Sequence, residues 1–266
     1  LFADSVRKRM IADVEVGSLL SGGIDSTLVT AYAKKHNPSI KTFTVGYGEH
    51  INELPFAKEA SEKIGTDHYT LQARDNLLEE LKKVIEYMDE PHADSSNLSQ
   101  HLVSKLASSK VKVALSGDGA DELFMGYGWY WNYKNTSKLN QLKNAFFSSQ
   151  FKERVKFTNA FSKEERHALL KNPSAVNDDI IGENVEKRSG NVVRKLNAFD
   201  LETYLPGQLL SKVDRASMMH GLEVRSPFLD YKLAEYVYNI PTEFKMKDDV
   251  GKIVIKDILG GIMPKE

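Results

Sequence analysis

The chain has 266 residues, with 36 Lys and Arg against 37 Asp and Glu and no cysteine, so its formal net charge is −1. A hydrophobic fraction of 41% and a charged fraction of 27% are typical of a folded globular protein and argue against a disordered or fibrous chain. The near-neutral charge argues against nucleic-acid and membrane partners. The lack of cysteine excludes a cysteine nucleophile within these residues. No apolar run reaches the ~18 residues of a membrane span, so we expect a cytoplasmic protein.

The first half of the chain alternates short apolar runs with stretches of helical periodicity, which is the pattern of βαβ units. Parallel strands joined by helices form a doubly wound α/β sheet, whose ligands bind at the carboxyl ends of the strands. Strands are predicted at Val14–Leu20, Ile40–Tyr47, His68–Leu71 and Val111–Leu115, and helices at Ser26–Lys35, Glu53–Ile64, Asn76–Met88 and Leu98–Ser108.

Beyond Tyr133 the strand-like runs end, and we expect a mostly helical second half. A lysine-rich helical pattern continues to Leu170, and Asn135–Gln150 is the most linker-like segment. The predicted organisation is a single domain, with an α/β core over residues 1–134 and a helical part over residues 135–266. The further predicted helices are Val192–Met219, Leu229–Tyr238 and Gly251–Leu259.

A segment rich in glycine and hydroxyl groups, Ser21–Thr27, follows the first predicted strand and opens the first predicted helix. Glycines let backbone amides approach an anion closely, and the positive end of a helix attracts negative charge, so the segment predicts a phosphate-binding loop. Asp25 would repel phosphate unless a divalent cation lay between them. The alternative is an ordinary strand-to-helix turn in which Asp25 caps the helix.

A second glycine-rich loop, Ser116–Tyr127, follows the fourth predicted strand. It carries three carboxylates within five residues, those of Asp118, Asp121 and Glu122. Such a cluster is self-repulsive unless a metal ion or a substrate cation binds there. The alternative is a glycine turn whose acidic residues are favoured by the dipole at a helix start.

These segments resemble those of a known enzyme group. Ser21–Thr27 resembles the pyrophosphate-binding loop of the ATP pyrophosphatase superfamily, whose members cut ATP between the α- and β-phosphates. Ser116–Tyr127 is similar to the matching loop of asparagine synthetases, as are Lys212–Met218, Leu222–Asp230 and Gly251–Lys256. These segments form four motifs, the third of which comprises Lys212–Met218 and Leu222–Asp230. The motifs stand in the family order and cover nearly the whole chain. The resemblance implies an adenine nucleotide alpha hydrolase-like fold and a carbon–nitrogen ligase.

The resemblance also implies ATP and Mg²⁺ as cofactors and assigns their contacts. Asp25 and Asp121 would share the Mg²⁺ that bridges the phosphates, and Lys252 would neutralise charge as the α-phosphorus is attacked. The alternative for Lys252 is an exposed helix lysine, in which case Lys256 is the next candidate. Nucleotide contacts are implied for Leu20, Ser21, Gly22, Gly23, Asp25, Ser26, Val45, Ser116, Gly117 and Lys252.

The acceptor site is implied less directly. Asp118 stands where the best-known family pattern has a glutamate that contacts the acceptor, and the shorter side chain leaves the identity of the acceptor open. Asp94 lies in a stretch that lines the acceptor pocket in relatives, but alone it is an acidic turn before a helix. Arg225 is a further candidate for acceptor binding, and its alternative role is an ion pair that fixes the helical half against the sheet.

The implied reaction is the ATP-dependent amidation of a carboxylate, with the conversion of aspartate to asparagine as the first expectation. The carboxylate attacks the α-phosphorus, pyrophosphate leaves, and ammonia displaces AMP from the acyl-adenylate. The family usually carries an amino-terminal glutaminase domain that this sequence lacks, so ammonia would come from such a domain, from a partner or from solution. A homodimer is compatible with the family.

Three alternatives remain open from the sequence. The same chemistry could act on a sugar-acid or cell-wall carboxylate, or on an intramolecular amine as in β-lactam synthetases, although those usually have tyrosine at the position of Asp118. The chain could also bind nucleotide without catalysis. A tRNA-modifying pyrophosphatase is opposed by the neutral charge and by the lack of cysteine.

Overall fold

The computed structural model describes residues 1–47, 52–73, 76–90, 92, 94–134, 163–172 and 187–263. The predicted linker Asn135–Gln150 and most of the lysine-rich pattern before Leu170 lie outside the described residues. Among the helices that the structure describes, none is long and apolar enough to cross a membrane.

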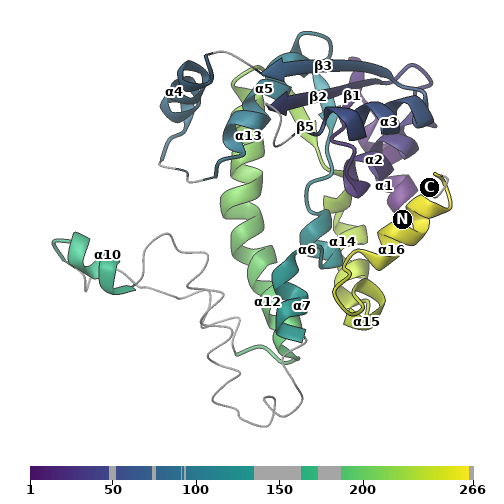
Figure 1. Ribbon diagram of the computed structural model, residues 1–266. Helices are drawn as coiled ribbons and strands as arrows, with labels where there is room; N and C mark the ends of the chain where they lie inside the picture. Colours follow the sequence, from purple (N-terminus) through teal and green to yellow (C-terminus); the bar gives the residue numbers. More distant parts are fainter. Residues whose placement is uncertain are drawn as a thin grey trace.

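Five parallel strands form a sheet in the order β3-β2-β1-β4-β5 (Figure 1). From β1 the chain moves outward through β2 to β3, and then returns to add β4 and β5 on the opposite side of β1. The strand order therefore reverses between β1 and β4, which is where open α/β sheets bind ligands. The predicted doubly wound α/β fold is confirmed. The strands are β1 (Val16–Leu19), β2 (Lys41–Tyr47), β3 (Asp67–Ala73), β4 (Val113–Leu115) and β5 (Glu223–Arg225).

Strand β5 corrects the expectation that no strand follows Tyr133. It pairs in parallel with β4, in a register that sets Leu115 beside Arg225. Two of its three residues, Glu223 and Arg225, are charged, so the segment lacks the apolar run that marks a buried strand. Its position at the sheet edge, where only one side is paired, tolerates this composition.

Alternate side chains of the strands enter two apolar layers, one on each face of the sheet. Val16, Val113 and Leu115 belong to one layer, whereas Phe43 and Ala114 belong to the other. This alternation follows from the period of two in a strand, and each fully buried large side chain stabilises the fold by about 1.5–3 kcal/mol. The first layer is covered by α1 (Phe2–Arg9), α2 (Ile24–Lys34), α14 (Tyr231–Asn239) and α16 (Ile253–Gly260), and the second by α5 (Asn97–Ser108), on which α13 (Ser211–Met218) packs.

The predicted helix over Val192–Met219 is a continuous rod, seen in Figure 1 as the long green helix. Its middle is a π-helix, η2 (Asp200–Leu210), which contains Pro206. Proline has no N–H and its ring crowds the carbonyl four residues earlier, so an α-turn fails there and a wider turn takes its place. The remaining described helices are α3 (Leu54–Ile64), α4 (Leu77–Tyr87), α6 (Ala120–Phe124), α7 (Gly128–Lys134), α10 (Lys163–Leu169), α12 (Val192–Phe199) and α15 (Thr242–Lys245), with a 3-10 turn at Pro227–Leu229.

A second apolar cluster joins α7 to α12. Tyr130 and Leu196 are fully buried in it. The buried carboxylate of Asp200 accepts hydrogen bonds from the Trp129 indole at 3.0 Å and from the Tyr130 hydroxyl at 2.7 Å. Because a buried charge without donors is costly, these bonds fix the start of η2 against α7.

A line of polar side chains joins α4 and α5 to the turn between α13 and β5. Nε2 of the buried His101 lies 2.6 Å from a Glu80 carboxylate oxygen, and its Nδ1 lies 3.0 Å from Nε2 of His220. Glu80 also pairs with Lys83 and Lys105. These hydrogen bonds, with that from His101 the largest, lower the pKa of Glu80 to about 2. The ionised carboxylate therefore stabilises the packing of α4 on α5.

We expect Glu80→Gln to lower the free energy of unfolding by about 1–2 kcal/mol at neutral pH. The pKa of Glu80 is depressed from 4.5 to about 2 in the folded chain, so its contribution is present above pH 4.5 and is lost as the pH falls toward 2. Urea unfolding measured across this pH range should show that the difference in unfolding free energy between wild type and variant becomes smaller as the pH falls. Glu79→Gln, at an exposed position of the same helix, is the control, and a difference that does not depend on pH would contradict the assignment.

Candidate active site

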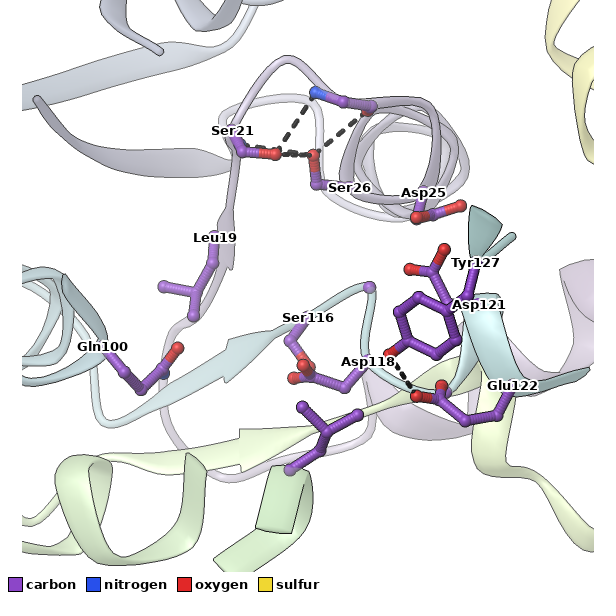
Figure 2. A pocket seen from close by; sticks show the side chains of 14 residues that line it. Leu19, Ser21, Asp25, Ser26, Gln100, Ser116, Asp118, Asp121, Glu122 and Tyr127 are labelled. Carbon is purple, nitrogen blue, oxygen red and sulfur yellow. Dashed lines mark hydrogen bonds between the residues drawn. The ribbon is translucent and has the colours of Figure 1, made fainter. Parts of the chain in front are cut away.

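The two glycine-rich loops leave neighbouring strands where the strand order reverses. Ser18 of β1 is paired with Leu115 of β4, so the loops that follow lie side by side. A Cβ atom on Gly117 would lie 2.9 Å from Cβ of Asp25, which shows how closely the loops approach. Between them is a cavity of about 300 Å³ (Figure 2). Of the residues predicted from the sequence, Ser21, Gly23, Asp25, Ser26, Ser116, Gly117, Asp118 and Asp121 line it.

The first loop is held in shape by its own hydroxyl groups. The Ser21 and Ser26 oxygens lie 3.0 Å apart, and the Ser21 hydroxyl accepts a hydrogen bond from the Gly23 amide (Figure 2). Gly22 adopts φ +78°, and a Cβ on it would lie 2.4 Å from the backbone of Phe56, so only glycine fits. The loop therefore brings backbone amides to the first turn of α2, which is the arrangement that binds anions.

Lys252 bridges the two loops. Its ammonium nitrogen lies 2.5 Å from an Asp25 oxygen and 2.7 Å from an Asp121 oxygen. Lys252 has φ +58° and stands just before α16. The approach depends on Gly126, because a Cβ there would lie 2.0 Å from Asp121 and 2.1 Å from the Lys252 side chain. A cation at a helix start is unfavourable, but two carboxylates offset that cost here.

Burial and charge act in opposite directions on this triad. Burial lowers the pKa of Lys252, but the fields of Asp25 and Asp121 outweigh it and raise the pKa above its usual value. Burial raises the pKa of Asp25 despite the nearby ammonium. One oxygen of Asp25 accepts no hydrogen bond from any described residue. A buried carboxylate oxygen without a donor is suited to a cation ligand.

The protein supplies few ligands for a metal ion at this point. Within the described ranges, no group of three or more His, Asp or Glu side chains is arranged to hold one. Asp25 and Asp121 alone would leave most of the coordination sphere of Mg²⁺ to other oxygens. This fits the way Mg²⁺ binds beside nucleotides, with one or two carboxylates and with phosphate and water completing the octahedron.

Glu122 and Tyr127 form another wall of the cavity, and Figure 2 shows the Tyr127 hydroxyl turned toward the carboxylate. Glu122 is 1% exposed. Its burial raises its pKa to about 7, and the hydrogen bond from Tyr127 opposes this shift. The sequence motif contains both residues but gave no signal for their pairing.

A second cavity of about 230 Å³ adjoins the first and is more apolar. Leu20, Phe43, Val45 and Val103 line it, and Leu20 and Val45 are two of the nucleotide contacts that the resemblance implies. It shares Leu19, Ser21, Gln100 and Asp118 with the first cavity. An apolar cavity beside an anion-binding loop has the shape that a nucleotide requires, with its base in the cavity and its phosphates at the loop.

Asp118 lies where the two cavities meet. Burial raises the pKa of its carboxyl, and the positive charge of Lys212 opposes that shift. The Leu222–Asp230 segment contacts this loop. The Ser226 hydroxyl donates a hydrogen bond to the Asp118 carbonyl, and Leu229 packs on Gly119. Part of the Leu222–Asp230 motif therefore positions the Asp118 loop.

Four of the predicted site residues, Gly22, Asp94, Arg225 and Lys252, line neither cavity. Lys252 instead pairs with two carboxylates that line the first cavity. The guanidinium of Arg225 donates to the carbonyls of Arg9 and Ile11, and it pairs with Glu223. This geometry matches the alternative of a structural contact, which ties the end of α1 to β5. Asp94 pairs with Lys212, which does line the second cavity. Gly22, by contrast, shapes the first loop.

Sequence reasoning gave no role to Lys212, Gln100 or Tyr127, although all three line a cavity. Glu122 was predicted only as a member of the acidic cluster. Gln100 lies on the buried side of α5 and has no local motif. Lys212 begins one of the segments that resemble the family, but the direction of its side chain depends on the course of the long helix. The one available signal in the sequence is that Lys212 stands at a position where the helical periodicity expects a buried apolar residue. A lysine is seldom buried unless it has a partner, so this position could have indicated a functional site.

Comparison with known proteins places the chain in a family. The family model described as "Asparagine synthase" matches residues 1–266. The chain belongs to the asparagine synthase family. It is 31% identical to "Asparagine synthetase [glutamine-hydrolyzing] 1" of Bacillus subtilis, over 98% of this chain and 46% of that protein.

Other organisms hold similar proteins. A "Putative asparagine synthetase [glutamine-hydrolyzing]" of Mycobacterium bovis is 32% identical over 98% of this chain and 44% of its own length. The human "Asparagine synthetase [glutamine-hydrolyzing]" is 26% identical over the whole chain and 40% of its own length. The chain therefore spans less than half the length of these curated asparagine synthase relatives.

In Tyr127→Phe, we expect the pKa of Glu122 to rise above its value of about 7, because the hydrogen bond that favours the ionised form is lost. At neutral pH a larger fraction of the carboxyl is then protonated. Infrared difference spectra across a pH titration would follow the carbonyl band of the protonated acid, which Glu122→Gln should remove. A midpoint that stays in place or falls would contradict this reading.

Proposed function

We propose that the chain catalyses ATP-dependent amidation of a carboxylate, and that the carboxylate is the side chain of aspartate. The observation that carries the proposal is the Lys252 ammonium, held between Asp25 and Asp121 beside the loop that starts α2. A cation and two carboxylates at a helix N-terminus suit a reaction in which charge develops on phosphate oxygens. The names of the relatives support asparagine as the product.

Asp25 and Asp121 are the proposed Mg²⁺ ligands, and the Asp25 oxygen without a donor fits this role. When bound, Mg²⁺ supplies charge neutralisation at the phosphate oxygens and orients the leaving pyrophosphate. Lys252 would then be released from its carboxylate partners toward the phosphates. A lysine ammonium is ordinarily cationic at neutral pH, so it can stabilise negative charge without a proton transfer.

The remaining residues bind and position the reactants. The amides of the Ser21–Ser26 loop would bind the β- and γ-phosphates, while Leu20 and Val45 hold the base in the apolar cavity. This sets the α-phosphorus near Asp118, where the two cavities meet. The acceptor carboxylate would form a bond to that phosphorus as pyrophosphate leaves. Rate enhancement would come from positioning and from electrostatics, with no covalent protein intermediate.

Ammonia would then form a bond to the acyl carbon, and AMP would leave with the electron pair of the broken carbon–oxygen bond. The names of the relatives describe glutamine-hydrolysing enzymes. We propose that the chain takes ammonia from a glutaminase part or partner, or from solution.

The proposal is tested by incubating the chain with Mg-ATP, ammonium and aspartate and following pyrophosphate, AMP and asparagine. We expect all three only when aspartate is present. Asp25→Asn and Lys252→Met should each lower pyrophosphate release by about 100-fold or more. Lys256→Met, one turn further along the same helix and exposed, should stay within about twofold of wild type. Pyrophosphate release at the wild-type rate by either site variant would refute the assigned roles.

A second prediction concerns the unliganded chain. Lys252→Met leaves the carboxylates of Asp25 and Asp121 facing each other without a cation, so we expect a loss of about 1–3 kcal/mol in stability. Mg²⁺ should restore more of the thermal unfolding midpoint in this variant than in wild type, because the ammonium no longer competes for the carboxylates. Lys256→Met should respond to Mg²⁺ as wild type does. An equal response in all three proteins would argue against a metal site at these residues.

A further inference from the structure

Lys212 is a buried cation that reaches the active-site cavities from α13. Its ammonium nitrogen lies 2.9 Å from an Asp94 carboxylate oxygen and 2.8 Å from the Ser96 hydroxyl. The side chain is 11% exposed, and it lines the second cavity together with Ser96 and Asp118. A lysine in this position has lost most of its hydration, so each of its N–H groups needs a partner.

The ammonium has three N–H donors, and two acceptors face it among the described residues. The third donor is therefore available to a molecule in the cavity. A buried donor without an acceptor costs about 1–3 kcal/mol, and more when it is charged. A ligand oxygen at this point would recover that cost, which makes it a specific anchor.

Asp118 supplies the opposite charge in the same cavity. Asp118 and Lys212 both line the second cavity. Burial raises the pKa of the Asp118 carboxyl and the charge of Lys212 opposes that shift, so the two groups interact electrostatically. A cation and an anion that face one cavity are complementary to a zwitterion, with its ammonium near the carboxylate and its carboxylate near the ammonium. The head group of an α-amino acid has this charge pattern, and neither a sugar acid nor a simple dicarboxylate does.

We propose that Lys212 determines acceptor specificity by binding the α-carboxylate of an amino-acid acceptor, whose ammonium group faces Asp118. The inference rests on the proposed function, which it extends by naming the recognition residue. It leaves the side-chain carboxylate of the acceptor free to reach the α-phosphorus. It also distinguishes the two lysines, since Lys252 serves the phosphates and Lys212 the acceptor.

Asp94 then acts as a positioning residue. One of its oxygens accepts hydrogen bonds from the Ser96 amide at 2.9 Å and the Ser96 hydroxyl at 2.6 Å, which fixes the turn before α5. Its other oxygen holds Lys212. Burial raises the pKa of Asp94, but these hydrogen bonds outweigh it and lower the pKa to about 2. Asp94 therefore stays ionised and keeps the lysine directed at the cavity.

A structural role for Lys212, in which it only ties α13 to the start of α5, makes a different prediction. Loss of a structural tie would weaken every acceptor to the same degree. Loss of a direct contact would weaken only acceptors that carry the α-carboxylate. L-Aspartate and β-alanine separate the two roles, because β-alanine keeps the amine and the reacting carboxylate but lacks the α-carboxylate.

Calorimetric titrations with these two ligands, in the presence of Mg²⁺ and α,β-methylene-ATP, test the inference. We expect wild type to bind aspartate about 10- to 100-fold more tightly than β-alanine, as for one hydrogen bond to a charged group. In Lys212→Met this preference should vanish. The double variant Asp94→Asn/Lys212→Met removes both charges and leaves no carboxylate unpaired, so it should show the same loss with less effect on the unfolding midpoint.

Each outcome decides the matter. A preference for aspartate that persists in both variants, or an equal loss for both ligands, overturns the specificity role. Wild type that binds the ATP analogue but shows no preference for aspartate also overturns it, while nucleotide binding and the amidation of another acceptor remain intact. If the chain fails to bind the ATP analogue, the proposed function itself fails and this inference falls with it.

Discussion

The site depends on one electrostatic constraint: two carboxylates from different loops must lie near each other, and a cation must lie between them. Asp25 comes from the first turn of α2, Asp121 from α6, and Lys252 from the residue before α16. These elements are far apart in sequence, so the two ion pairs of Lys252 hold the start of α16 against the loops that follow β1 and β4. Without a cation the approach of the loops would be repulsive, and with it the cavity has a defined shape.

The sheet topology makes this convergence available. Because the strand order reverses between β1 and β4, the two loops begin side by side at the carboxyl ends of these adjacent strands. The glycines at 117 and 126 then remove the side chains that would hold the loops apart. Backbone geometry thus sets the distance between the charges, and the charges in turn set which ions and ligands the space accepts.

The sequence could predict the elements whose pattern is local. The apolar runs of β1 to β4 and the periodic helices follow from burial on one or two faces, and the glycine-rich loops follow from their chemistry. It could not predict β5, whose Glu223 and Arg225 look like loop residues and whose pairing with β4 is non-local. For the same reason the neighbours of Arg225 and Lys212 were out of reach, since both are set by segments more than 100 residues away.

The wide turns at Pro206 have a consequence for the direction of side chains. Eleven residues complete about three turns of an α-helix, but fewer turns of the wider π-helix. The direction in which successive side chains point therefore lags across η2, relative to a continuous α-helix. The rod contacts α7 along α12 and α5 along α13, so this lag changes which residues of α13 face α5. Lys212 lies two residues beyond the end of η2. The direction in which its side chain points, toward the second cavity, therefore depends on the wide turns around Pro206.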